Sequence, residues 1–225
     1  MKLGVLFSGG KDSTYSAWLA KQAGNELVCL ITLFSKNQDS YMFHTPLIEL
    51  TKKQADLMNL PILIAKTEGI KEEELLDLEK IIKKAIKKYK IEGIITGAVA
   101  SNYQAERIQK ICNKLKIKCV NPLWGKNQID LLNDLVKNKF EVIIIGVAAF
   151  PLDKTWIGRK IDTNYIQEMR KLQEKYGINP NGEGGETESL VINCPLFKEK
   201  LKLKGTIAVG SGNSWRANPF FCKKK

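Results

Sequence analysis

The stretch KLGVLFSGGKDS, residues 2–13, joins a short apolar run to a glycine-rich turn and the start of a helix. The apolar run predicts a buried strand, because it ends abruptly at Ser8-Gly9-Gly10. From Asp12 onward, apolar residues recur every three to four positions, which indicates a helix. Ligands of α/β sheets bind at such strand-to-helix turns, where glycines let the backbone fold tightly and a helix N-terminus attracts anions. The stretch therefore predicts a phosphate site.

Four more short apolar runs predict strands in the first part of the chain, at residues 27–34, 62–65, 93–96 and 118–120. Amphipathic helical patterns separate them, and one of these helices is expected to begin at Thr45-Pro46. Parallel strands need crossover helices, and these helices cover both faces of the sheet. The pattern predicts a doubly wound parallel α/β sheet, which we assign to a first domain of residues 1–125.

The alternation of short apolar strands with amphipathic helices ends at Asn121-Pro122. A helix (129–136), a strong strand (141–147) and a second helix (162–176) are followed by a glycine-rich acidic segment, a strand (189–193) and an alternating edge strand (201–209). We expect residues 126–225 to form a smaller α+β domain.

The composition is that of an ordinary globular protein, with 225 residues, 44% hydrophobic and 27% charged. The longest apolar stretch has nine residues (142–150), which is too short to cross a bilayer, and the apolar run at the N-terminus is too short for a secretory signal. Five scattered cysteines contain no C-x-x-C pair. We expect a cytoplasmic protein with reduced, mostly buried thiols and no membrane contact.

The net charge of +12 is spread evenly along the chain. Residues 1–125 carry 19 basic and 13 acidic side chains, and residues 126–225 carry 17 and 11. Only four of the 36 cations are arginine, the residue that recognises phosphates and bases bidentately. A solvated lysine-rich surface is favoured, and binding of a polyanion such as nucleic acid stays the alternative.

The turn Ser8-Gly9-Gly10-Lys11-Asp12-Ser13 fits neither the Walker A nor the Rossmann spacing. It resembles the pyrophosphate loop of the adenine nucleotide alpha-hydrolase superfamily, whose fold is Rossmann-like (HUP type). That resemblance implies a protein that binds ATP and cleaves it between the α and β phosphates. The loop would hold the pyrophosphate leaving group, with Asp12 and Ser13 near Mg²⁺.

Over nearly its full length the chain resembles the diphthine–ammonia ligase (diphthamide synthase) family. The matching blocks are residues 8–13, 40–45, 97–107, 122–124, 152–159 and 182–188, while Pro151 and Thr187 depart from the pattern. The resemblance implies that ATP and ammonium amidate diphthine, the modified histidine of translation elongation factor 2, through an acyl-adenylate, with release of AMP and pyrophosphate.

Candidate site residues follow from these blocks. Ammonium must lose a proton before it attacks, and a carboxylate can accept that proton. We expect Asp12, Glu183 and Glu186 to be catalytic, Asp12 to bind metal, and Glu188 to be structural. The expected ATP-binding residues are Ser8, Gly9, Gly10, Lys11, Asp12, Ser13, His44, Gly97, Ser101, Tyr103, Gln104 and Arg107.

Several of these residues also have simpler roles. Ser101 and Gln104 have the form of a capping box, Arg107 could be a solvated cation, and Trp124 and Trp156 suit packing. Two other functions stay open, a tRNA-modifying enzyme with the same loop and a non-catalytic adenine-nucleotide sensor. The sequence also leaves open whether the chain forms a homodimer.

Overall fold

A computed structural model describes residues 1–35, 48–70 and 73–221. The chain forms two compact units, Met1–Trp124 and Gly125–Lys225. Within the described ranges, no helix is long and apolar enough to cross a membrane.

The first unit is built on a parallel sheet of β1 (Lys2–Leu6), β2 (Glu26–Ser35), β3 (Ile62–Thr67), β4 (Gly93–Ile95) and β5 (Lys118–Val120). The strand order is β3-β2-β1-β4-β5, and every pairing is parallel. This confirms the predicted doubly wound α/β fold. The order reverses between β1 and β4, so the carboxyl ends of these two strands mark the position where such sheets bind ligands.

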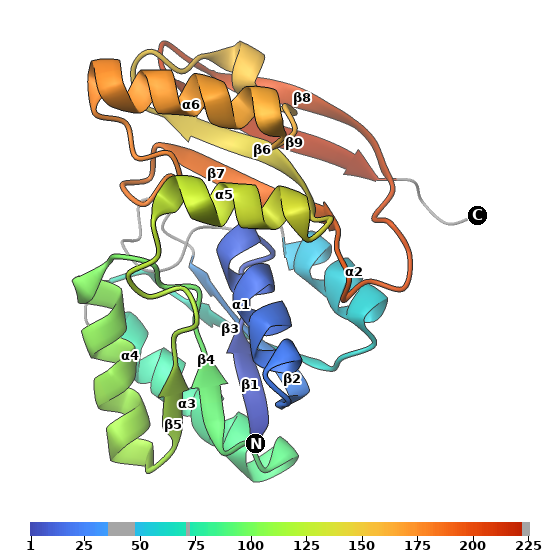
Figure 1. Cartoon of the computed structure of the whole chain (residues 1–225). Coiled ribbons are helices and arrows are strands. Elements are labelled where there is room, and N and C mark those ends of the chain that lie inside the picture. Colours follow the sequence, from blue (N-terminus) through green and yellow to red (C-terminus); the bar gives the residue numbers. More distant parts are fainter. Residues whose placement is uncertain (36–47, 71–72, 222–225) are drawn as a thin grey trace. The chain divides into compact units, whose positions relative to one another are not determined.

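Helices cover both faces of this sheet (Figure 1). The helices α3 (Glu73–Tyr89) and α4 (Asn102–Leu115) bury an apolar cluster against one face, in which Leu78 and Ile82 of α3 are fully buried. The helices α1 (Lys11–Gln22) and α2 (Ile48–Met58) lie on the opposite face. The predicted start of α2 at Thr45-Pro46 lies outside the described residues.

The second unit has an antiparallel sheet in the order β7-β6-β9-β8. Its strands are β6 (Glu141–Ala148), β7 (Thr187–Asn193), β8 (Leu203–Ser211) and β9 (Ser214–Phe221), and its helices are α5 (Gln128–Lys137), a short 3₁₀ turn η1 (Lys154–Trp156) and α6 (Thr163–Tyr176). Both α5 and α6 pack over this sheet (Figure 1). The predicted α+β character of this part is confirmed.

Local signals set the ends of α6. The side chain of Asp162 accepts a hydrogen bond from the Tyr165 amide at the N-cap, and Gly177 ends the helix with a left-handed φ of 70°. The strand β9 was not predicted from the sequence. Its signal is the two-residue turn Gly212-Asn213, in which Gly212 has a φ of 55° and joins β8 to β9 as a hairpin.

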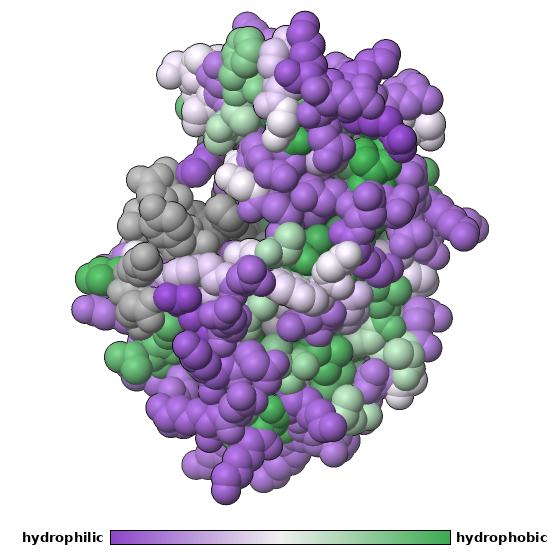
Figure 2. Space-filling view, turned by 60° about the vertical axis from the view of Figure 1, so that its left-hand side comes forward, coloured by the Kyte–Doolittle hydropathy of each residue, from purple (hydrophilic) through white to green (hydrophobic). Residues whose placement is uncertain are grey.

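The surface of both units is mostly hydrophilic in the view of Figure 2, and the apolar areas between the hydrophilic residues are small.

Candidate active site

The loop after β1 lies at the carboxyl edge of the parallel sheet. The Thr32 hydroxyl of β2 donates a hydrogen bond to the Phe7 carbonyl at 2.7 Å and holds the loop where it leaves the sheet. Gly9 has a left-handed φ of 81°, and the buried Gln54 of α2 donates from Nε2 to its carbonyl at 2.9 Å. A side chain at Gly9 would collide with the Gln54 carboxamide, so glycine is required here by both conformation and space.

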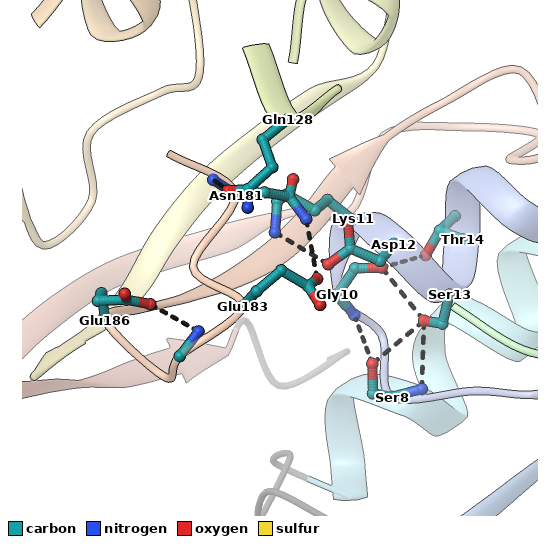
Figure 3. Close-up of polar contacts among 11 residues, drawn as sticks. Ser8, Gly10, Lys11, Asp12, Ser13, Thr14, Gln128, Asn181, Glu183 and Glu186 are labelled. Atoms are coloured by element: carbon teal, nitrogen blue, oxygen red, sulfur yellow. Dashed lines mark hydrogen bonds and ion pairs between the residues drawn. The ribbon is translucent and has the colours of Figure 1, made fainter. Parts of the chain in front are cut away.

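Two serines close the loop on itself (Figure 3). The Ser8 and Ser13 hydroxyl oxygens lie 3.1 Å apart, and the Ser8 amide donates to Ser13 Oγ at 3.3 Å. The Gly10 amide donates to Ser8 Oγ at 3.3 Å, and the Thr14 hydroxyl donates to the Gly10 carbonyl at 2.8 Å. The loop is therefore held in a defined shape by its own polar groups.

Helix α1 begins directly at this loop. Its N-cap is Gly10, which has no side chain with which to cap the helix. The first amides of a helix point along its axis at the positive end of the helix dipole, and this arrangement favours an anion. The helix start thus has the geometry of a phosphate site.

Lys11 and Asp12 place opposite charges at the same point. The Lys11 side chain is only 4% exposed, and its Nζ lies 2.9 Å from Asp12 Oδ2, which belongs to a side chain that is 25% exposed. Among the described residues, no three His, Cys, Asp or Glu side chains gather to hold a metal ion. Mg²⁺ commonly binds through one or two carboxylates together with substrate phosphates, so Asp12 fits such an ion and an all-protein metal site is not required.

Gly97 packs against the backbone of α1. A Cβ atom at Gly97 would lie 2.8 Å from the Ser13 nitrogen and 3.0 Å from the Asp12 carbonyl carbon. The preceding Thr96 donates from its hydroxyl to Asn121 Oδ1 at 2.6 Å and accepts from the Ala98 amide at 3.2 Å. The turn after β4 is thereby fixed against the start of α1, and the structure brings two separate candidate motifs together.

The four candidates around α4 have local partners. Ser101 caps α4 and accepts a hydrogen bond from the Gln104 amide at 3.4 Å, as the capping pattern predicts. The Arg107 guanidinium lies 3.5 Å from the centre of the Tyr103 ring and donates to the Tyr103 carbonyl at 3.4 Å. These residues follow β4 at the same edge of the sheet. His44 lies outside the described residues.

In the second unit, Glu186 holds the glycine-rich loop together. Its Oε1 accepts from both nitrogens of Asn179, at 2.6 Å from Nδ2 and 3.3 Å from the amide, and its Oε2 accepts from the Gly184 amide at 2.7 Å. Both carboxylate oxygens are thus engaged within the loop. Glu186, expected to be catalytic, therefore has a clear structural role, because it fixes the backbone that carries Glu183.

Glu183 accepts a hydrogen bond from Asn181 Nδ2 at 3.2 Å. The Asn181 amide in turn donates to Oε1 of Gln128, the first residue of α5, at 3.0 Å. Glu188 lies in β7 with its side chain against Gly146 of β6. Sequence reasoning missed Gln128, Asn179 and Asn181, although the run Asn179-Pro180-Asn181-Gly182 is a turn signal that precedes the acidic segment.

Thr187 departs from the family pattern quoted above, and the structure shows what it contacts. Its side chain is 7% exposed, hydrogen-bonds with the Tyr165 hydroxyl and packs against Gly182, whose φ is 75°. Burial raises the pKa of the Tyr165 hydroxyl, so this group stays protonated. The contact fixes the beginning of β7 beneath the loop.

The described cysteines are free thiols, and three of the four are buried. Burial raises the pKa of Cys29 and of Cys194 to about 12, which disfavours the nucleophilic thiolate form. A hydrogen bond between the Cys112 and Cys119 thiols raises the pKa of Cys112 and lowers that of Cys119. None of these groups belongs to the candidate site.

Comparison with known proteins matches both units to one family. Residues 1–119 match the model "Diphthamide synthase N-terminal domain", and residues 127–224 match "Diphthamide synthase C-terminal domain". Diphthine–ammonia ligase of Bos taurus is 36% identical over 89% of this chain and 82% of that protein, and the Homo sapiens protein of the same name is 35% identical over the same shares.

A crystal structure of a predicted subunit of tRNA methyltransferase from Methanocaldococcus jannaschii aligns with 89% of this chain and 99% of that chain, at 18% identity and a TM-score of 0.45. The assignment follows from the two family models, which together cover nearly all of the sequence, and from relatives above 30% identity that are aligned over most of their length. The chain belongs to the diphthamide synthase family.

Proposed function

We propose that this protein is a diphthine–ammonia ligase, which uses ATP and ammonium to amidate diphthine on translation elongation factor 2 and releases AMP and pyrophosphate. The observation that carries the proposal is the closed loop Ser8–Ser13 at the start of α1, in a chain whose two units both match diphthamide synthase models. Residues 1–125 form the proposed ATP-binding domain and residues 126–225 the proposed substrate domain.

The first step activates the acceptor. A carboxylate oxygen of diphthine attacks the α-phosphorus of ATP, the bond to the bridging oxygen breaks, and pyrophosphate leaves, so that an acyl-adenylate remains. The α1 amides and Lys11 would bind the negative charge that grows on the leaving group. Asp12 would hold Mg²⁺ together with the phosphates, and the ion would supply further charge neutralisation there.

Gly97 and Ser13 position this machinery. Because the backbone of Gly97 touches the first turn of α1, the phosphate-binding amides are fixed relative to the end of β4. The start of α4 lies after β4 at the same edge of the sheet. We propose that its residues bind the rest of the nucleotide together with His44; they are Ser101, Tyr103, Gln104 and Arg107.

The second step transfers nitrogen. Ammonium gives one proton to a carboxylate, the resulting ammonia attacks the acyl carbon, AMP leaves, and the amide loses a further proton. We assign proton acceptance to Glu183, because Glu186 uses both carboxylate oxygens to hold the loop. Glu186 then acts as a positioning residue for Glu183.

The test is a reconstituted reaction. The protein is incubated with ATP, Mg²⁺ and ammonium, together with either diphthine-bearing elongation factor 2 or total tRNA, and AMP, ADP and acceptor mass are measured. The proposal predicts stoichiometric AMP and amidated elongation factor only with the protein acceptor. AMP formed with tRNA alone would indicate the tRNA-modifying alternative, and nucleotide binding without turnover would indicate a sensor. A translation factor as acceptor agrees with the cytoplasmic location that the sequence predicts.

A further inference from the structure

Two aromatic rings lie exposed at one end of the second unit. Phe150 follows the end of β6 and is 64% exposed, the highest value among the large hydrophobic side chains of the described residues. Tyr176 is the last residue of α6 and is 40% exposed. Their ring centres lie 5.3 Å apart with an interplanar angle of 89°, an edge-to-face pair between residues far apart in the sequence.

The two rings contact each other although both are exposed. Each ring holds the other in place, so binding a partner there would restrict few additional torsions. Lys175 Nζ lies 5.1 Å from the centre of the Tyr176 ring and adds a positive charge beside the apolar surface. Exposed aromatic side chains with a charged rim have the composition of binding hot spots.

The aromatic pair lies at the base of the acidic loop. Helix α6 ends at Tyr176, and the loop that carries Glu183 and Glu186 begins directly after it. The other side of the loop is fixed to β6, because the Ala148 amide donates to the Glu186 carbonyl at 2.9 Å, two residues before Phe150. The pair therefore lies close to the two points where the loop is joined to α6 and held to β6.

We propose that Phe150 and Tyr176 form a docking surface for the diphthine-bearing acceptor protein. This inference rests on the proposed function, which requires a folded protein to present one modified side chain beside the loop. The pair lies close to the points where that loop leaves α6 and is held to β6, and ATP and ammonium are too small to need such a surface. Its chemistry fits an apolar side chain of the acceptor flanked by a carboxylate that faces Lys175.

The experiment compares Phe150→Ala and Tyr176→Ala with Val209→Ala in the full-length protein. Val209 is a matched control, since it is 60% exposed in β8 of the same unit. Affinity for diphthine-bearing elongation factor 2 is measured by biolayer interferometry, and amidation is measured as a function of acceptor concentration. Melting temperatures identify folded variants, and Tyr176→Phe tests rescue by the ring alone.

We expect each aromatic-to-alanine variant to weaken acceptor binding and to raise KM for the acceptor by about tenfold, with kcat at saturating acceptor and KM for ATP unchanged. Val209→Ala and Tyr176→Phe should behave like the wild type. If both alanine variants bind the acceptor as tightly as the wild type, the docking surface is overturned. Amidation by the wild type would in that case still support the proposed function. If acceptor binding depends on the rings but no amidation is found, the proposed function is overturned and the docking surface is kept. If the alanine variants lose dimerisation of this protein while acceptor binding is unchanged, the docking surface is overturned and the pair is assigned to contact with a second copy.

Discussion

Replacing Gly97 with alanine tests whether the contact between β4 and α1 positions the phosphate site. The new Cβ would lie 2.8 Å from the Ser13 nitrogen and 3.1 Å from the Ser13 Cα. Ordinary contacts begin near 3.4 Å, so the first turn of α1 must move by about 0.6 Å. All three neighbouring atoms belong to the backbone, and no side chain can rotate to relieve the contact.

A shift of this size changes nucleotide binding more than folding. An amide that donates to phosphate at about 2.9 Å would be left near 3.5 Å, beyond a good hydrogen bond. Loss of one charge-assisted hydrogen bond corresponds to about 1.5–3 kcal/mol, and each 1.4 kcal/mol is tenfold in affinity. We expect the Kd for ATP to rise by at least about tenfold, and overpacking to lower the free energy of unfolding by about 1–3 kcal/mol.

The assay is isothermal titration calorimetry with ATP and Mg²⁺ in the absence of acceptor, alongside urea unfolding. Gly205→Ala is the matched control, because nothing lies within 4 Å of a Cβ at Gly205 and its backbone φ is not left-handed. That variant should bind ATP like the wild type. A folded Gly97→Ala variant whose Kd for ATP stays within about twofold of wild type would refute the argument, since the α1 amides would then not contribute to binding.

Three further predictions concern carboxylates. Asp12→Asn removes the carboxylate beside the buried Lys11. The rate of AMP release should therefore fall at least about tenfold, and urea unfolding should show that the free energy of unfolding falls by about 1 kcal/mol. Normal turnover would exclude Asp12 from the reaction. Glu186→Gln places an amide NH₂ against N–H donors of the loop, so it should slow amidation and speed hydrogen exchange of the loop backbone. Glu183→Gln should slow amidation alone. Unchanged hydrogen exchange in both variants would exclude the positioning role of Glu186. A hydrogen bond from Lys200 lowers the pKa of Glu141, so the stabilising effect of this carboxylate is complete at neutral pH and is lost as the pH falls through the lowered pKa. The difference in unfolding free energy between wild type and Glu141→Gln should therefore shrink as the solution is acidified, and a constant difference would assign the effect to packing.

The parallel sheet and the position of the glycine-rich loop after β1 could be predicted from the sequence, because both depend on local patterns. An apolar run, a glycine turn and a helical repeat are read over a few neighbouring residues, and they set β1 and α1 with bounds close to those observed. The cap at Ser101 and the helix end at Gly177 are local in the same way. The hairpin strand β9 was missed, although its turn signal was also local.

The roles of individual site residues depended on contacts between distant residues. Adjacent glycines look equivalent in the sequence, yet only Gly9 has a left-handed φ, while Gly10 is extended and caps α1. Three glutamates in seven residues suggested shared chemistry, and only the folded loop shows that Glu186 binds Asn179 and the Gly184 amide. The physical reason is that a periodic pattern fixes which way a side chain faces, whereas its partners are chosen by the packing of segments that lie far apart in the chain, as Phe150 and Tyr176 do.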